Sequence, residues 1–317
     1  MLSAQPSVVT LCDDRLEPED FIAAFGETPT PYVARRIRNY DFRYRQLGSD
    51  ERDACIRRIV DVLCNGGHAP AGEARFANWN EGWAAHLGQL DKDFRLSDIV
   101  PGYFGKYPVL RWQQQFIAPL DKEFEYHSLA VIEDWLFDKY LRDVGCAYEF
   151  GCGTGHNLFR IREVNPEAEL WGLDWAPSSQ QILARLGRLD IGRKISGRRF
   201  NLFAPDHDFS LAPDAAVLTV AALEQTADRF HPFVDYLLEQ KPALCIHIEP
   251  IAELLDPENL LDSLSLAYFH RRNYLSGFLE HLRVLEAAGR LKIHLARRTS
   301  VGSMFIDGYS VVVWSPV

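Results

Sequence analysis

The segment 148–158, YEFGCGTGHNL, holds the residue pattern in this chain that is best suited to binding a cofactor. Gly151, Gly153 and Gly155 lie between an apolar run and a segment with helical spacing, and the carboxylate Glu149 precedes them. Glycines let a ligand approach bare backbone, and the positive end of the following helix attracts polar ligand groups. The pattern predicts a strand, a tight turn and a helix that together hold a nucleotide-like cofactor.

Two common nucleotide loops fit this segment poorly. The dinucleotide fingerprint G-x-G-x-x-G requires a third glycine where His156 stands, which leaves an NAD-dependent oxidoreductase as a weak alternative. A P-loop would require Gly-Lys-Ser/Thr after the glycines, and that sequence is missing here.

The order Glu149, Gly151, Gly153, Gly155 resembles the E/D-x-G-x-G-x-G motif of class I S-adenosylmethionine-dependent methyltransferases. The resemblance implies that the glycines admit the aminocarboxypropyl chain and ribose of S-adenosylmethionine. It also implies that Glu149 places negative charge near the ammonium and sulfonium groups of this cofactor. The resemblance covers roughly residues 145–317 and leaves the N-terminal half unexplained.

Further positions follow the same resemblance along the chain. Asp174, at the end of the next expected strand, stands where the family hydrogen-bonds the ribose hydroxyls. Trp175 is expected to pack on the adenine or the ribose. Asn201 and Leu202 follow the third expected strand and are expected to surround the adenine, and Gln225, after the fourth, is expected to contact the cofactor.

Four residues are candidates for catalysis: Glu224, His247, Tyr103 and Tyr107. Glu224 ends the fourth expected strand, where the resemblance implies contact with the reactive methyl group. His247 shares a strand face with Glu249, although a structural role in the core is the more common one for a buried histidine. The two tyrosines belong to an aromatic cluster whose rings attract a sulfonium cation by about 0.5 to 2 kcal/mol per contact. The sequence does not indicate which of these four residues acts as the general base.

Charged residues and metal-ligand spacings give less information about function than the glycine segment does. Lys106 and Arg111 are candidates to bind a carboxylate or phosphate of a substrate, and a solvated position stays open for both. The spacings H-x-x-H and H-E-x-x-H and close cysteine pairs do not occur, so no metal is expected.

The surrounding elements predict an α/β fold with a doubly wound, mostly parallel seven-stranded sheet, a C-terminal antiparallel hairpin within residues 290–317, and an N-terminal helical cap. The other expected strands are 147–152, 169–175, 196–203, 215–221 and 243–250. The expected helices are 31–48, 49–67 and 124–145 in or next to the cap, and 156–165, 178–189, 229–240 and 271–289 beyond it. We expect two domains, a substrate-selecting cap over 1–142 and a cofactor-binding domain over 143–317.

Composition limits the function classes. The chain has 317 residues, 47% of them hydrophobic, and a net charge of −10, which disfavours broad binding to nucleic acid. No leader-like start and no run of about 18 apolar residues occurs, so we expect a cytoplasmic protein without membrane contact. We expect a small molecule as its partner, and the sequence leaves a homo-oligomer open.

These observations predict an S-adenosylmethionine-dependent methyltransferase-like enzyme of specialised metabolism that acts on a small molecule. The expected reaction is in-line displacement at a carbon attached to the sulfonium. A first alternative is a methyltransferase-like cyclase that converts S-adenosylmethionine itself to azetidine-2-carboxylate and methylthioadenosine. A second is a non-catalytic methyltransferase-like binding module.

Overall fold

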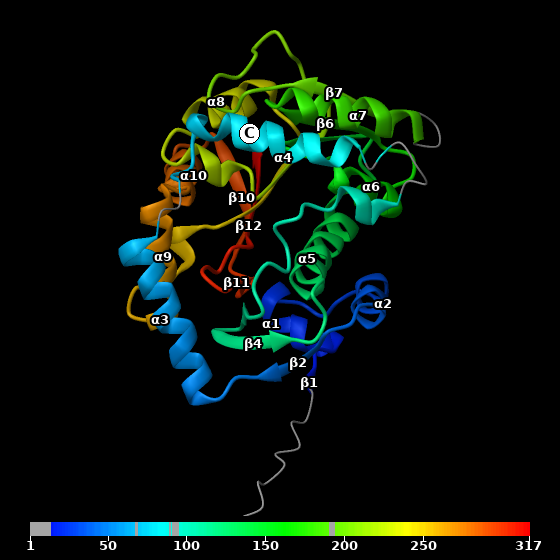
Figure 1. Ribbon diagram of the computed structural model, residues 1–317. Coiled ribbons are helices and arrows are strands. Elements are labelled where there is room, and N and C mark those ends of the chain that lie inside the picture. Colours follow the sequence, from blue (N-terminus) through cyan, green and yellow to red (C-terminus); the bar gives the residue numbers. More distant parts are fainter. Residues whose placement is uncertain (1–13, 67–68, 89, 91–94, 190–193) are drawn as a thin grey trace, which may run out of the picture.

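The computed structural model describes residues 14–66, 69–88, 90, 95–189 and 194–317 (Figure 1). Its larger sheet has seven strands in the order β7-β6-β5-β8-β9-β12-β10. Their bounds are β5 (Cys146–Phe150), β6 (Glu169–Asp174), β7 (Ile195–Arg199), β8 (Ala216–Val220), β9 (Leu244–Glu249), β10 (Leu291–Arg297) and β12 (Ser310–Pro316). Only β12 runs antiparallel to its neighbours β9 and β10. The predicted sheet and its antiparallel C-terminal hairpin are confirmed.

Helices cover both faces of this sheet because its strands are apolar on both sides. In β8, Ala216 and Leu218 belong to one core and Val217 to the other, as expected when successive side chains point to opposite faces. The first core includes α5 (Phe124–Tyr140), α6 (His156–Val164) and α7 (Pro177–Leu189). The second includes α8 (His231–Gln240) and α10 (Phe278–Ala287). The fold is therefore doubly wound, as predicted.

The N-terminal segment contains strands as well as helices. Its helices are α1 (Ile22–Phe25), α2 (Pro31–Asn39), α3 (Ser49–Asn65) and α4 (Phe76–Leu87). An antiparallel sheet in the order β1-β2-β4-β3-β11 joins β1 (Asp14–Arg15), β2 (Arg43–Gln46), β3 (Leu110–Trp112) and β4 (Gln115–Pro119) to β11 (Val301–Ser303). In Figure 1, β11 (red) lies close to β4, which belongs to the N-terminal segment. The expected helix over 31–48 is wrong beyond Asn39, because β2 follows it.

One expected helix begins at its expected residue, Ser49, and another is interrupted. The N-cap of α3 is Gly48, whose amide donates to Glu51 Oε2 at 3.0 Å, so Ser49 is already inside the helix. The expected helix over 271–289 is broken. Asn273 ends α9 (Leu260–Arg272) in the left-handed region at φ 52°, and Gly277 precedes α10 at φ 78°.

Helix α5 is buried nearly all round rather than on one face. It packs against the apolar core on several sides and contacts α2, α6 and β11. Its acidic residues Glu133 and Asp134 are fully buried, and each pairs with Arg160 of α6 at 2.8 Å. A buried charge is tolerated only when it is paired. The Arg160 guanidinium therefore stabilises the two buried carboxylates, as water would on a surface helix.

Among the residues that the structure describes, no helix combines the length and the apolar character needed to cross a membrane. Cys146, Cys152 and Cys245 are buried free thiols.

Candidate active site

The main cavity opens at the carboxyl ends of β5, β6 and β8 and has a volume of about 350 Å³. Strand order reverses there, because β5 lies between β6 on one side and β8 on the other. Open parallel sheets bind ligands at such a point. Other parts of the chain also line it: the region around α4, residues 101–107, the first turns of α5, the segment 200–203 after β7, the end of α9, and the loop between β11 and β12.

The three glycines adopt left-handed backbone conformations; Gly151 and Gly153 line the cavity, whereas Gly155 packs against Leu183 and is not among the lining residues. Their φ angles are +71° at Gly151, +54° at Gly153 and +75° at Gly155. A Cβ on Gly153 would stand 2.9 Å from the ring of Trp83, and one on Gly155 would stand 2.8 Å from Leu183. Both the backbone conformation and the space therefore require glycine at these positions.

Helix α4 lies over this loop and belongs to the N-terminal segment. Figure 1 shows it (cyan) running beside α7 (green). Asn80 holds the two together: its side chain accepts from the amide of Ser178 at 3.1 Å, and its carbonyl accepts from the Ser178 hydroxyl at 2.8 Å. The N-terminal segment thus closes one side of the cavity.

Glu149 is buried at the end of β5 and lines the cavity. Its Oε1 accepts a hydrogen bond from Asn157 Nδ2 at 2.7 Å, while its Oε2 has no donor among the described residues. Burial raises the pKa of this carboxyl well above 4.5. A buried acceptor without a donor is costly, so this oxygen is suited to a donor on a ligand.

Asp174 ends the adjacent strand β6 and ties it to the loop. Its Oδ2 accepts from the amide of Gly153 at 2.9 Å and its Oδ1 from the amide of Ala176 at 2.8 Å. Burial raises the pKa of Asp174 to about 6. Each oxygen keeps a second lone pair, so the carboxylate can still accept two hydroxyl groups.

Aromatic rings form a slot next to Asp174. The rings of Trp175 and Phe203 stack with centroids 5.7 Å apart, and Phe76 meets Trp175 edge-on at 5.4 Å. Leu202 also lines the cavity, as predicted. Asn201 does not, because its side-chain oxygen accepts from the amide of Phe203 at 3.0 Å and shapes the turn instead. The expected contact of Asn201 with the adenine therefore has no support from the cavity lining.

Glu224 and Gln225 lie on a single 3-10 turn, Leu223–Thr226, that follows β8, and both line the cavity. Gln225 Nε2 donates to Glu224 Oε1 at 2.8 Å. Burial and the nearby Glu249 raise the pKa of Glu224 to about 8. Glu249 holds this turn in place, since its carboxylate accepts from the amides of Ala222, Leu223 and Glu224 at 3.1, 2.9 and 3.1 Å.

His247 lies in the core and does not line the cavity. Its Nδ1 is 2.9 Å from Thr219 Oγ1, and its Nε2 accepts from Trp314 Nε1 at 2.9 Å. Burial lowers the pKa of this ring to about 3. Both ring nitrogens are occupied within the fold, so the expectation of catalysis by His247 is corrected to a structural role.

Of the aromatic and basic candidates in residues 103–111, three line the cavity: Tyr103, Tyr107 and Lys106. Tyr103 is 43% exposed. Arg111 is buried elsewhere, and its guanidinium donates to the carbonyls of Met304, Leu261 and Phe305 at 3.2, 2.7 and 2.9 Å. Arg111 therefore joins β3 to α9 and to the loop after β11, and its guanidinium is not available to a substrate.

Sequence reasoning did not identify several lining residues as part of the site. They come from segments far apart in the chain: Arg75, Trp79, Trp83, Glu125, His156, Tyr268, Arg272, Tyr274, Phe305 and Tyr309. The spacing of Trp79 and Trp83, four residues apart on one helix face, was the local signal available for these two rings.

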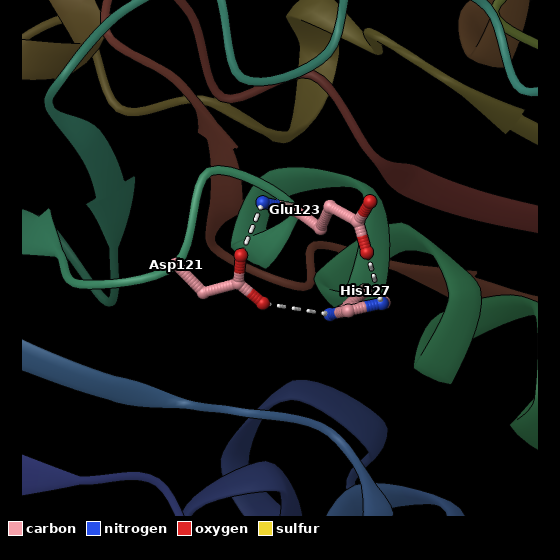
Figure 2. A group of neighbouring side chains, drawn as sticks. All are labelled: Asp121, Glu123 and His127. Carbon is pink, nitrogen blue, oxygen red and sulfur yellow. Dashed lines mark hydrogen bonds and ion pairs between the residues drawn. The ribbon is translucent and has the colours of Figure 1, made fainter. Parts of the chain in front are cut away.

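A cluster of Asp121, Glu123 and His127 lies at the start of α5, outside the cavity (Figure 2). Each of the three side chains has one atom of a type that can bind a metal ion, and these three atoms lie within 4.8 Å of one another. Asp121 Oδ1 accepts from the amide of Glu123 at 3.0 Å, and His127 stacks on Tyr40 with ring centroids 4.1 Å apart. The start of the helix and this stacking account for the cluster.

No protein-family model and no curated protein matches this chain. Solved structures that resemble it include N-methyltransferase NodS from Bradyrhizobium japonicum WM9 in complex with S-adenosyl-L-homocysteine, at 11% identity and a TM-score of 0.45, over 74% of this chain and 98% of that one. Another is human N-acetylserotonin methyltransferase in complex with S-adenosylmethionine, at 12% identity and a TM-score of 0.44, over 84% and 67%.

A third is an O-methyltransferase, NcsB1, from neocarzinostatin biosynthesis, in complex with S-adenosyl-L-homocysteine and 1,4-dihydroxy-2-naphthoic acid. It shares 16% identity and a TM-score of 0.42 over 62% of this chain, which spans about half of its length (54%). All three of these proteins are methyltransferases.

Proposed function

We propose that the protein is an S-adenosylmethionine-dependent methyltransferase that acts on a small molecule. One observation carries the proposal. Glu149 and Asp174 end the adjacent parallel strands β5 and β6, flank one glycine loop and line one cavity. The sheet order with its single antiparallel strand β12 supports the same reading.

The residues at this site fit S-adenosylmethionine. Glu149 Oε2 lacks a donor, which the ammonium group of the cofactor would supply, and Asp174 has lone pairs for the two ribose hydroxyls. The rings of Trp175 and Phe203 offer an aromatic face to the adenine. Gln225 Oε1 is a second buried acceptor without a donor and is proposed to contact the cofactor.

The loop glycines complete the fit, because Gly151 and Gly153 leave bare backbone along the cavity. When bound, S-adenosylmethionine supplies a methyl carbon on a positively charged sulfur, from which the sulfur leaves readily. The proposed reaction is in-line displacement at this carbon by a nucleophile of the acceptor.

The side chains of the site are proposed to exclude water, orient the acceptor and remove its proton. Burial around Glu224 and the aromatic lining exclude water and orient the acceptor. Glu224 is the proposed base, because it lines the cavity and has no cationic partner within 4.0 Å among the described residues. Tyr103 and Tyr107 are proposed to contact the acceptor or the sulfonium.

We also propose that residues 1–142 act as a cap that selects the substrate, and that 143–317 bind the cofactor. The position of α4 over the loop supports this division. A cavity of about 350 Å³ suits a small molecule, and small-molecule biosynthesis in specialised metabolism is the setting we propose.

Isothermal titration with S-adenosylmethionine and S-adenosylhomocysteine tests the proposal. We expect micromolar binding that falls at least tenfold in Glu149→Gln and Asp174→Asn, whereas Glu258→Gln, an exposed acid away from the cavity, leaves it unchanged. Absence of binding at high micromolar cofactor would contradict the proposal.

Mass spectrometry of the nucleoside products then separates the reactions. S-adenosylhomocysteine that forms only with an added acceptor supports methyl transfer. Methylthioadenosine that forms without an acceptor would instead support the cyclisation alternative.

A further inference from the structure

A buried guanidinium without a counter-ion lines the cavity. Arg272, the last residue of α9, is 9% exposed. Its Nη1 donates to the Tyr268 hydroxyl at 3.1 Å, but its Nε is buried with no acceptor, and no carboxylate of the described residues lies within 4.0 Å. Burying an unpaired cation is expensive, so this group is suited to an anion from outside the chain.

Arg75 brings a second guanidinium to the same cavity. It precedes α4, its Cζ lies 4.7 Å from the centre of the Trp79 ring, and it makes no ion pair with a described carboxylate. Burial and the charge of Arg272 lower the pKa of Arg75. Two like charges in a partly dry site repel one another, and an anion bound by both would offset this repulsion.

The backbone places these two arginines together. The amide of Ala71 donates to the carbonyl of Arg272 at 2.6 Å, which fixes the chain just before Arg75 against the end of α9. The rings of Tyr268 and Tyr274 lie 5.7 and 5.2 Å from the Arg272 guanidinium and limit its directions. The pair is therefore held by the fold and is not a chance meeting of flexible side chains.

Glu224 is the cavity carboxyl whose charge acts on both arginines, but it forms an ion pair with neither and bonds Gln225 instead. Its pKa of about 8 leaves it mostly protonated at neutral pH, so it does not neutralise them. Lys106 adds a third positive charge to the lining. Glu149 and Asp174, at the glycine loop, face the part of the cavity assigned above to the cationic cofactor.

An aromatic wall lies beside the arginines. Tyr268 stacks on Phe305 with ring centroids 5.3 Å apart, and Tyr107 meets Phe305 edge-on at 5.0 Å. All three rings line the cavity. Such a wall favours a flat, apolar ligand body, and a guanidinium favours a carboxylate or phosphate with two oxygens to accept its donors.

We propose that the acceptor of the methyl group is a small aromatic molecule that carries an oxyanion, and that Arg75 and Arg272 bind this oxyanion. That the bound molecule accepts a methyl group rests on the proposed function. That Arg75 and Arg272 bind an oxyanion does not depend on it. Arg75 and Arg272 replace Arg111, which the sequence had suggested for this task.

Ligand-observed NMR and calorimetry on the full chain test the site with three probes: benzoate, phenyl phosphate and the neutral benzamide. Each is titrated with and without saturating S-adenosylhomocysteine. We expect at least one charged probe to bind ten times or more tightly than benzamide. The tighter of the two charged probes identifies the oxyanion as a carboxylate or a phosphate.

Arg272→Gln and Arg75→Gln should each weaken the charged probe about tenfold to a hundredfold and leave benzamide unchanged, and Arg272→Lys should retain part of the affinity. Arg271→Gln is the matched control, because Arg271 is the exposed neighbour and does not line this cavity. Arg75→Gln, at a half-buried position, keeps the test valid if Arg272→Gln fails to fold.

Equal affinity for benzoate, phenyl phosphate and benzamide would overturn the inference. So would an equal loss of S-adenosylhomocysteine and the charged probe in Arg272→Gln, since the arginines would then hold the carboxylate of the cofactor. If S-adenosylhomocysteine itself fails to bind the wild-type chain, the proposed function fails, and the titrations without it still decide the oxyanion site.

Discussion

The indole ring of Trp83 lies directly against Gly153, so that a Cβ at position 153 would stand 2.9 Å from ring atom Cζ2. Trp83 belongs to α4 in the N-terminal segment, and Gly153 belongs to the loop between β5 and α6. The proposed cap and the proposed cofactor loop thus pack so closely here that even a methyl group on residue 153 would not fit.

Gly153→Ala should disrupt this contact. The new methyl group would meet Trp83 in a residue whose φ of +54° is already unfavourable for alanine, so we expect a loss of about 1 to 2 kcal/mol in the free energy of unfolding. Affinity for S-adenosylhomocysteine should fall at least tenfold by calorimetry. Gly82→Ala is the control, because nothing lies within 4 Å of its added Cβ in α4, and it should stabilise slightly. Unchanged affinity in Gly153→Ala would contradict the assignment of the loop.

Glu249→Gln should impair turnover although Glu249 is not among the residues that line the cavity. The three amides of residues 222–224 donate to both of its oxygens, and a glutamine can replace only one of them. We expect kcat to fall more than the affinity for S-adenosylhomocysteine, with a stability loss of about 1 to 3 kcal/mol. Glu253→Gln controls for stability alone, since Glu253 accepts from the amides of Leu279 and Glu280. If both variants keep full kcat, the turn does not position Glu224.

The rate of methyl transfer should depend on the ionisation of Glu224. Its raised pKa of about 8 means that the carboxyl is protonated at neutral pH and becomes a base only above that value. We expect kcat to rise with pH through about 8 and then to level off. Glu224→Gln should lower kcat and remove this rise, and an identical pH profile in the variant would exclude Glu224 as the base.

Glu125 should make the free protein less stable at alkaline pH. Burial raises its pKa from 4.5 to about 7, so the folded chain retains this proton over a range in which the unfolded chain has lost it. The free energy of unfolding should therefore fall as pH rises from about 4.5 to about 7. Glu125→Gln keeps an acceptor for the amide of Gly105 and should be more stable than the wild type at pH 8, by up to about 3 kcal/mol, but not at pH 4.5.

Urea unfolding at both pH values measures this difference. The exposed Glu258→Gln serves as the control and should show the same stability as the wild type at both. A stabilisation by Glu125→Gln that is equal at pH 4.5 and pH 8 would mean that the proton plays no part in it.

The parts of the fold that the sequence predicted are those specified by local patterns. The run of three glycines after an apolar strand predicted the loop, and the strands β5, β6, β8 and β9 appear within two residues of their expected bounds. The resemblance to the methyltransferase motif pointed to Glu149 and Asp174, and both residues line one cavity. A short apolar run that is followed by turn residues is readily assigned as a buried strand.

The parts that were missed depend on contacts between distant segments. Strand β2, with the polar sequence RYRQ, has no strand pattern of its own and exists because β1 and β4 pair with it. His247 was misassigned because alternation along β9 shows which residues share a face, but not that this face meets Trp314. Arg75 and Arg272 are brought together by contacts between distant segments, such as the bond from the Ala71 amide to the carbonyl of Arg272, and no local pattern reveals these contacts.

The pairing of β3 with β11 also determines the order in which the chain can complete its fold during synthesis. Val301 pairs with Trp112 and Gly302 with Arg111, so the edge of the N-terminal sheet stays open until residues 301–303 have left the ribosome. Contacts this far apart in sequence form late and slowly. A ribosome-bound chain that ends before residue 300 should therefore have an unfinished cap, and the chain should acquire its cap and its ligand site only when its last strands arrive.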